Sequence, residues 1–250
     1  MKALVTGAAL GLALVLAGCG ENGAGGPGQA SPSAPVAAVP PPAGQSWSDI
    51  VTATPEGGFM MGNPNAAVKL VEFASLTCHV CAEFSEQGEQ PLIERYVETG
   101  KVSFEIRNFI RDPADLAAAL LARCNGPAAF FKLADQMYAA QDEWLGKLQQ
   151  MTPAQQQSLQ SLPPQQTVAV LAQQAGLIDF VRVRGVPTQK AQQCLANEAE
   201  LNRLVQMQQK ATQDMPNFAG TPTFTINGEM VQNAAAWVAL EPRLKAAVGG

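Results

Sequence analysis

Two cysteines three residues apart, Cys78 and Cys81, are the strongest chemical signal in the sequence. They follow an apolar, β-like run at residues 68–74 and a polar turn that contains two possible helix-capping residues, Ser75 and Thr77. Residues three apart at the start of a helix lie on one face, so the two sulfurs can interconvert between disulfide and dithiol with little backbone movement. The unpaired N–H groups of a helix start also favour a thiolate. We therefore expect Cys78 to be an exposed nucleophile and Cys81 its buried resolving partner.

Two other interpretations of this pair stay open. A C-x-x-C pair can be half of a zinc site, but zinc takes about four nitrogen or sulfur ligands, and the only histidine of the chain, His79, lies inside the motif. The pair can also be a structural disulfide, which has no need of a strand-to-helix junction. The redox interpretation fits the position best, and we predict no metal site.

Glu72 is a charged residue inside the apolar run that precedes the cysteines. In an extended strand it shares a face with Val68, Leu70 and Ala74. If the strand is central, Glu72 is partly buried under the helix of the cysteines, has a raised pKa and can exchange protons with Cys81. If the strand lies at an edge, Glu72 is merely solvated.

Residues 62–81, taken together with the Gly-Thr-Pro-Thr-Phe run at residues 220–224, resemble the DsbA-like branch of the thioredoxin superfamily. The resemblance extends over residues 47–248. It implies an α/β, thioredoxin-like fold, with a central mixed sheet flanked by helices and an inserted all-helical domain. It further implies an acidic residue at the place of Glu72, and a cis-proline at Pro222 that faces the cysteines and leaves the backbone of Thr221 free to pair with a substrate strand.

The function implied by the resemblance is the introduction of disulfides into exported proteins with free cysteines, with a quinone-linked membrane protein as reoxidant and without a cofactor. The dipeptide between the cysteines departs from the usual Pro-His of that family, because here it is His79-Val80. An imidazolium at His79 would still favour the Cys78 thiolate. A disulfide isomerase or reductase with the same fold stays an alternative, as does a non-enzymatic, lipid-tethered chaperone or copper-binding module.

The first part of the chain reads as a targeting segment. Lys2 precedes a 14-residue apolar stretch, and Leu16-Ala17-Gly18-Cys19 resembles a bacterial lipobox. We expect residues 1–18 to be a lipoprotein signal peptide, Cys19 to carry lipid, and residues 19–46 to be a Gly-, Pro- and Ala-rich flexible tether. The protein would then be anchored in the bacterial cell envelope facing the periplasm, with the outer membrane as the favoured membrane. An ordinary signal peptide or a short anchor is the alternative.

The rest of the chain divides into a thioredoxin-like domain, residues 47–111 and 216–250, and a helical insertion, residues 112–215. In the first we expect a short strand or a lead-in at residues 47–54, strands at 67–74 and 101–110, a helix at 78–96 kinked by Pro91, a hairpin at 220–231 and a last helix at 235–248. In the second we expect helices from Asp112 through 121, and at 126–144, 151–159, 163–176 and 188–215.

Two cysteines remain, Cys124 and Cys194, both in the insertion. An exported protein is folded in an oxidising compartment, so we predict that they form a structural disulfide between two helices. Two buried free thiols are the alternative, since sequence does not show whether the two Cα atoms approach each other. The 16 basic and 21 acidic residues argue against nucleic acid as a partner.

Overall fold

A computed structural model describes residues 35–250 of the chain. The predicted signal peptide, the predicted lipid on Cys19 and residues 19–34 of the predicted tether lie outside this range. None of the helices in the described range is both long and apolar enough to cross a membrane.

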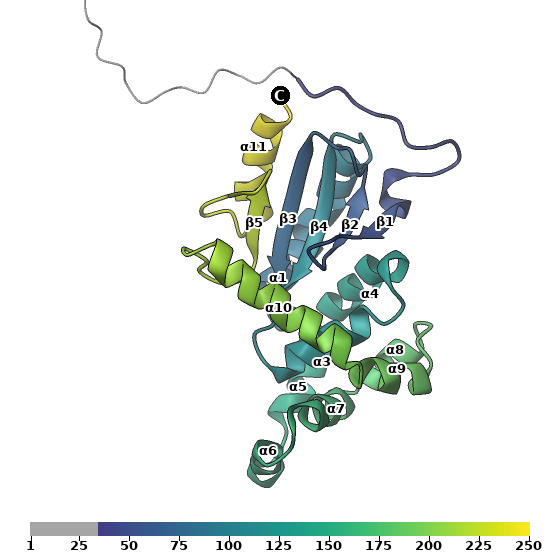
Figure 1. Ribbon diagram of the computed structural model, residues 1–250, viewed down its shortest axis with the longest axis vertical. Helices are drawn as coiled ribbons and strands as arrows, with labels where there is room; N and C mark the ends of the chain where they lie inside the picture. Colours follow the sequence, from purple (N-terminus) through teal and green to yellow (C-terminus); the bar gives the residue numbers. More distant parts are fainter. Residues whose placement is uncertain (1–34) are drawn as a thin grey trace, which may run out of the picture. The chain divides into compact units, whose positions relative to one another are not determined.

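The described chain is built on a six-stranded mixed sheet with the strand order β1-β2-β4-β3-β5-β6 (Figure 1). The neighbours β3 and β4 are parallel, and every other neighbouring pair is antiparallel. The sheet follows a short 3₁₀ helix, η1 (Trp47–Asp49). Its strands are β1 (Val51–Ala53), β2 (Phe59–Gly62), β3 (Val68–Ala74), β4 (Val102–Asn108), β5 (Thr223–Ile226) and β6 (Glu229–Met230). The short strand β2 was not predicted, because four residues show too little alternation to be recognised.

Strand β3 is buried on both faces, as expected for a strand in the middle of a sheet. Leu70 and Ala74 belong to the main core, whereas Val71 and Phe73 pack with Ala211 in a smaller cluster on the other face. Since β3 lies between β4 and β5, the edge position considered for Glu72 is wrong.

The helical run after the cysteines is continuous but irregular. It consists of α1 (His79–Phe84), the π-helical segment η2 (Ser85–Glu89), α2 (Gln90–Leu92) and the π-helical segment η3 (Ile93–Val97). Pro91 has no N–H to donate, so it interrupts the regular hydrogen-bond ladder. π-helical turns on both sides of Pro91 accommodate this interruption.

The insertion lies between β4 and β5 in the chain and gathers at one end of the sheet (Figure 1). Two of the expected helices are interrupted, so each consists of two helices. The helix expected at residues 126–144 is interrupted at Ala140. The helix expected at residues 188–215 is interrupted before Asn197, whose side chain caps the next helix. Helix α8 was not predicted. The helices are α3 (Pro113–Ala122), α4 (Pro127–Ala139), α5 (Gln141–Gln149), α6 (Pro153–Gln160), α7 (Pro164–Gln174), α8 (Leu177–Arg182), α9 (Thr188–Leu195) and α10 (Glu198–Asp214).

The chain then returns to the sheet. Asn227 and Gly228, with φ of 52° and 88°, form the two-residue turn of the predicted β5–β6 hairpin. The last helix, α11 (Trp237–Ala247), covers the sheet as expected. The predicted mixed sheet with a helical insertion is therefore confirmed.

The segment before Trp47 packs against the fold instead of continuing a flexible tether up to residue 46. The N–H of Val36 donates to the carbonyl oxygen of Val248 over 2.9 Å, and that of Val39 to Thr99 over 2.9 Å. The indole of buried Trp47 donates to the carbonyl of Val39 over 2.8 Å. The predicted tether therefore extends too far, because two backbone hydrogen bonds and a buried indole fix residues 36–39 in place.

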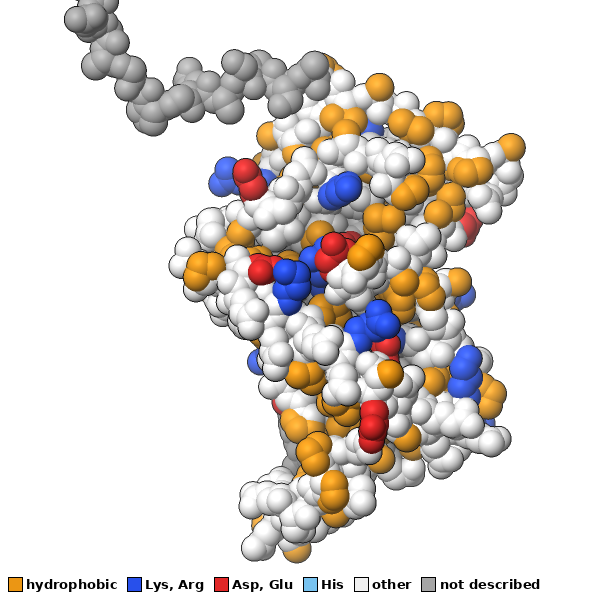
Figure 2. All heavy atoms as spheres, viewed as in Figure 1, with side chains coloured by type: hydrophobic (Ala, Val, Ile, Leu, Met, Phe, Trp, Pro, Cys, Tyr) orange, Lys and Arg blue, Asp and Glu red, His pale blue; other side chains and the backbone are white. Residues whose placement is uncertain are grey.

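Arg123, at the end of α3, joins the insertion to the sheet. Its guanidinium donates to Glu200 over 2.6 Å, to the Asn108 side chain over 3.2 Å and to the Gly57 carbonyl over 2.8 Å. It also lies 4.1 Å from the ring centre of Phe59. The side chain is only 3% exposed, so every hydrogen bond that it makes replaces water. Figure 2 shows basic and acidic side chains next to each other in the middle of one face of the molecule.

Replacing Arg123 by Met should lower the free energy of unfolding by about 3 kcal/mol, because Glu200 and the Gly57 carbonyl lose a buried partner. The measurement is urea-induced unfolding with the disulfide intact. Arg182→Met is the matched control: Arg182 pairs with Asp179 over 3.1 Å but is 51% exposed, so its loss should cost less than about 1 kcal/mol. Equal effects of the two substitutions would contradict the role given to Arg123.

Candidate active site

Cys78 lies where β3 gives way to the active-site helix. It is the N-cap residue of α1, with φ −90° and ψ 119°, and its Sγ accepts a hydrogen bond from the backbone N–H of Cys81 over 3.4 Å. Both cysteines are free thiols in the structure. The sulfur thus takes the place that a Ser or Asp oxygen has in an ordinary helix cap.

The loop before β5 closes over the same sulfur. The peptide bond between Thr221 and Pro222 is cis, and the carbonyl oxygen of Thr221 accepts a hydrogen bond from the Cys78 thiol over 3.1 Å. Cys78 is consequently only 4% exposed, so the prediction of an exposed nucleophile is wrong. Cys81 is fully buried, as expected.

The two thiols differ sharply in acidity. The pKa of Cys78 falls from 9.0 to about 5. The largest cause is the hydrogen bond from the Cys81 thiol, which outweighs burial; the Thr221 side chain, the Cys81 N–H and the charge of Arg111 lower the pKa further. Burial, followed by the hydrogen bond to Cys78 and the charge of Glu72, raises the pKa of Cys81. At neutral pH the Cys78 sulfur is therefore mostly a thiolate, which no longer donates to the Thr221 carbonyl, and Cys81 is a protonated thiol.

Glu72 lies in the core beside these sulfurs. It is 2% exposed, and its Oε1 is buried without a hydrogen-bond partner. Burial, with a contribution from the charge of Cys78, raises the pKa of this carboxyl well above its usual value. A protonated carboxyl near a buried thiol is the arrangement needed for proton exchange with Cys81.

His79 does not have the role that was predicted for it. Its side chain is 69% exposed, and its Nδ1 lies 3.3 Å from Gln141 Oε1 and 3.8 Å from Asp142. The groups that lower the pKa of Cys78 are Cys81, Thr221 and Arg111. The prediction that an imidazolium at His79 stabilises the thiolate is therefore not supported, because as the first residue of α1 it points its side chain to the partners on α5.

Asp115, in the first turn of α3, was missed by the sequence analysis. Its carboxyl is buried and accepts hydrogen bonds from the Leu76 N–H over 2.8 Å, the Ser75 hydroxyl over 2.7 Å and the Arg111 N–H over 3.0 Å. Burial raises its pKa to about 7. Asp115 therefore ties the turn before Cys78 to the insertion. An acidic residue in the first turn of a helix is too common to have indicated this.

Gln141, at the start of α5, was also missed. Its Nε2 donates to the carbonyl oxygens of Leu76 over 2.7 Å and Cys78 over 3.1 Å. It is 2% exposed. Together with Asp115, Gln141 fixes the backbone that carries the nucleophile, and nothing in the sequence distinguishes it from the other glutamines of the insertion.

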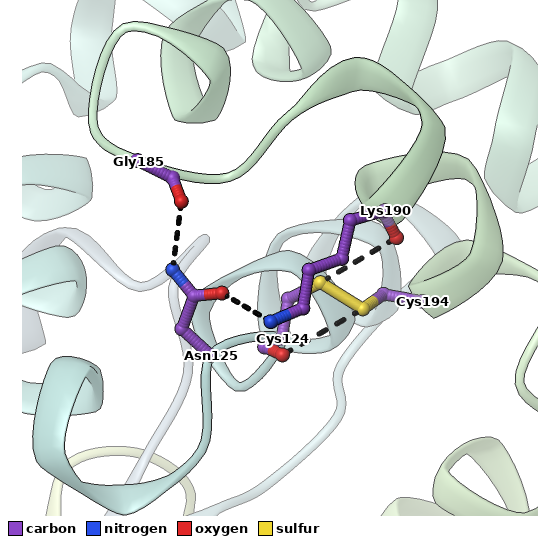
Figure 3. Close-up of a disulfide and its surroundings, with 5 residues drawn as sticks. All are labelled: Cys124, Asn125, Gly185, Lys190 and Cys194. Atoms are coloured by element: carbon purple, nitrogen blue, oxygen red, sulfur yellow. Dashed lines mark hydrogen bonds between the residues drawn. A yellow bond between two sulfur atoms is a disulfide. The ribbon is translucent and has the colours of Figure 1, made fainter.

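A disulfide joins Cys124, just after α3, to Cys194 in α9, with a Cα–Cα distance of 5.7 Å (Figure 3). Asn125 next to it donates to the Gly185 carbonyl over 3.2 Å and accepts from the Lys190 ammonium over 2.7 Å. The disulfide and Asn125 together connect helices within the insertion. No group of three or more His, Cys, Asp or Glu in residues 35–250 has the arrangement of a metal site.

Thr221→Val should raise the pKa of Cys78, because the valine removes a buried hydroxyl that has no other hydrogen-bond partner and that lowers the pKa of this thiol. A hydrogen bond to a charged group contributes about 1.5–3 kcal/mol, so the titration midpoint should rise by about one pH unit. Thiolate absorbance of the reduced protein against pH measures it. In the control Thr223→Val the hydroxyl lost is one that donates to the Gly220 carbonyl, and the midpoint should stay near pH 5. Equal midpoints in the two variants would refute the contribution of Thr221.

Comparison with known proteins agrees with this geometry. A family model described as Thioredoxin matches residues 54–246. A protein of Rickettsia prowazekii, provisionally named a protein-disulfide oxidoreductase, is 28% identical over 179 residues, which are 71% of this chain and 57% of that protein. The chain thus spans little more than half the length of this curated relative.

Solved structures are also similar. A crystal structure titled protein-disulfide isomerase from Novosphingobium aromaticivorans is 34% identical, with a TM-score of 0.72, over 76% of this chain and 97% of that one. The structure of α-DsbA1 from Wolbachia pipientis shares the fold at 19% identity, with a TM-score of 0.63, over 79% of this chain and 94% of that one. The chain therefore belongs to the thioredoxin family and has the DsbA-like form of its fold, a thioredoxin-like sheet with a helical insertion.

Proposed function

We propose that the protein is a thiol:disulfide oxidoreductase that donates the Cys78–Cys81 disulfide to exported proteins. The observation that carries this proposal is the opposite acidity of two adjacent thiols, a pKa of about 5 for Cys78 and a raised pKa for Cys81. A stabilised Cys78 thiolate favours the reduced form of the pair, which makes its disulfide a good oxidant. The names of the relatives from Rickettsia and Novosphingobium support the same class of chemistry.

The reaction begins with the oxidised pair. A substrate thiolate attacks the Cys78 Sγ, forms a mixed disulfide and breaks the Cys78–Cys81 bond, and Cys81 leaves as a thiolate that takes a proton from Glu72. A second substrate thiolate then attacks the substrate sulfur of the mixed disulfide. Cys78 leaves as a thiolate, so the substrate gains a disulfide and the Cys78–Cys81 pair gains two electrons.

Substrate recognition is proposed at the loop before β5. A substrate strand that pairs with the backbone of Thr221 would bring its sulfur next to Cys78, because the Thr221 carbonyl oxygen lies 3.1 Å from the Cys78 sulfur. Such docking would give the substrate thiol access to Cys78 despite the low exposure of that residue. Pro222 fixes the shape of that loop.

The cellular setting is proposed from the sequence. A lipid on Cys19 would anchor the protein in the envelope, with residues 1–18 removed, and a quinone-linked membrane protein would reoxidise the pair. Val36 and Val39 hydrogen bond near the ends of α11 and η3, next to the beginning of β4, whereas Cys78 follows the opposite, carboxyl end of the parallel strand β3. The chain therefore enters the folded unit at the end of the sheet away from Cys78.

Equilibration of the purified protein with glutathione, read by tryptophan fluorescence, tests the proposal. We expect a reduction potential more oxidising than that of glutathione, because Cys78 is a stabilised thiolate. The signal should disappear in Cys78→Ser. Cys81→Ser should accumulate a mixed disulfide between Cys78 and glutathione, because the Cys78 thiolate attacks glutathione disulfide, releases one glutathione thiolate and has no Cys81 thiol to resolve the product. The control is the double variant Cys124→Ser/Cys194→Ser, which should keep the potential.

A potential well below that of glutathione would overturn the oxidase proposal. It would favour a reductase or an isomerase. The repair of a substrate protein with scrambled disulfides would then distinguish these two activities. A Cys78→Ser variant that keeps full function would point instead to a chaperone.

A further inference from the structure

A cavity of about 850 Å³ lies beside the active-site helix, between it and helices α4 and α5. It begins at His79, next to the nucleophile, and passes along α1 and η2 to α4. Six of its fifteen lining residues are acidic and none is Lys or Arg. These acids are Glu83, Glu86, Glu89, Glu94, Asp135 and Asp142.

Two of these acids differ from the rest, because Glu89 is buried and Asp135 is half-buried, whereas the other four are exposed. Glu89 is 4% exposed, and its Oε1 is buried without a hydrogen-bond partner. Asp135 accepts a hydrogen bond from the Ser85 hydroxyl over 2.8 Å. Burial raises the pKa of both carboxyls, and the charge of Asp135 raises that of Glu89 further. Glu89 therefore keeps its proton to a higher pH than an exposed glutamate does.

Glu72 lies behind this pair and does not line the cavity. Its Oε1, like that of Glu89, is buried and unpartnered. Burial is the largest cause of the raised pKa of Glu72 and of Glu89. The charges of Cys78 and Asp135 raise the pKa of Glu72 further, and the charges of Asp135 and Glu72 raise that of Glu89, so the three carboxyls are close enough to interact. A series of groups thus leads from a buried sulfur to an open cavity, in the order Cys81, Glu72, Glu89 and Asp135.

We infer that Glu89 and Asp135 relay protons between Glu72 and the water of this cavity, and that they serve Cys81 through Glu72. The inference rests on the proposed function. When Cys81 leaves as a thiolate, Glu72 gives it a proton, and Glu89 replaces that proton on Glu72. Asp135 and the water of the cavity restore the proton of Glu89. When the dithiol is reoxidised, Glu72 first passes its proton along the same route to the water of the cavity. The Glu72 carboxylate then takes the proton of Cys81 before the Cys81 sulfur attacks Cys78.

The other titratable groups around the cavity do not serve this purpose. Glu83, Glu86 and Glu94 on the active-site helix and Asp142 on α5 reach solvent directly. The Tyr138 hydroxyl, on α4, donates to the Ser75 carbonyl over 3.3 Å, and burial raises its pKa well above the usual value. His79 is mostly exposed at the mouth of the cavity. Among the carboxyls of the lining, only Glu89 is buried and only Asp135 is half-buried, so these two connect the interior to the water of the cavity.

The test is the reaction of the reduced protein with oxidised glutathione, followed by rapid acid quenching and mass measurement. In the first phase the Cys78 thiolate attacks glutathione disulfide, forming a mixed disulfide and releasing one glutathione thiolate. In the second phase Cys81 gives up its proton and attacks Cys78, releasing the second glutathione. The relay affects only the second phase, because the first needs no proton from Cys81.

Glu89→Gln should slow the second phase by at least about tenfold and flatten its pH profile, because an amide does not pass on a proton. The first phase should stay within about twofold of the parent protein. Asp135→Asn should act in the same way. Glu86→Gln, which removes an exposed acid from the same cavity, should change neither phase and is the matched control.

Groups in series are not additive, so Glu72→Gln/Glu89→Gln should be no slower in the second phase than Glu72→Gln alone. The relay is overturned if Glu89→Gln and Asp135→Asn close the disulfide as fast as Glu86→Gln, or if the double variant is slower by the product of the single effects. Absence of a mixed disulfide on Cys78 in the parent protein would instead refute the proposed function, so the two failures are distinguishable.

Discussion

The negative charge on the Cys78 sulfur is the physical constraint that the site is built around. A buried thiolate loses its hydration, and it persists only if fixed donors replace the lost water. The start of α1 supplies the Cys81 N–H and thiol, and the loop before β5 supplies Thr221. These donors come from segments about 140 residues apart in the chain, so the acidity of Cys78 depends on the fold of the whole sheet.

The same sulfur requires a rigid backbone around it. Asp115 and Gln141 hold the turn at residues 75–78 through hydrogen bonds to Leu76 and Cys78, and both belong to the helical insertion. Arg123 and its buried hydrogen bonds fix that insertion to the sheet. The insertion is therefore part of the redox site, because hydrogen bonds from its side chains position the backbone that carries the nucleophile.

Buried acids are the second feature that organises this part of the molecule. A carboxylate without compensating donors is costly in a protein interior, so such groups hold a proton under conditions in which exposed acids have lost it. Glu72 and Glu89 each have an unpartnered buried oxygen, and Asp135 lies at the cavity. These protonated acids are linked through Glu72 to Cys81. Cys81 gains a proton when its bond to Cys78 breaks and loses one when that bond forms.

The sequence by itself determined the local elements and the identity of the reactive pair. The alternation in residues 68–74, the capping turn and the two cysteines predicted the β3–α1 junction, and Asn227-Gly228 predicted the hairpin, because these signals are local. Only the tertiary structure decided that Cys78 is covered by the Thr221 loop, that His79 turns to α5, and that Asp115, Gln141, Glu89 and Asp135 gather around the site. Their roles depend on burial and on contacts between segments far apart in the chain, which periodicity and spacing do not encode.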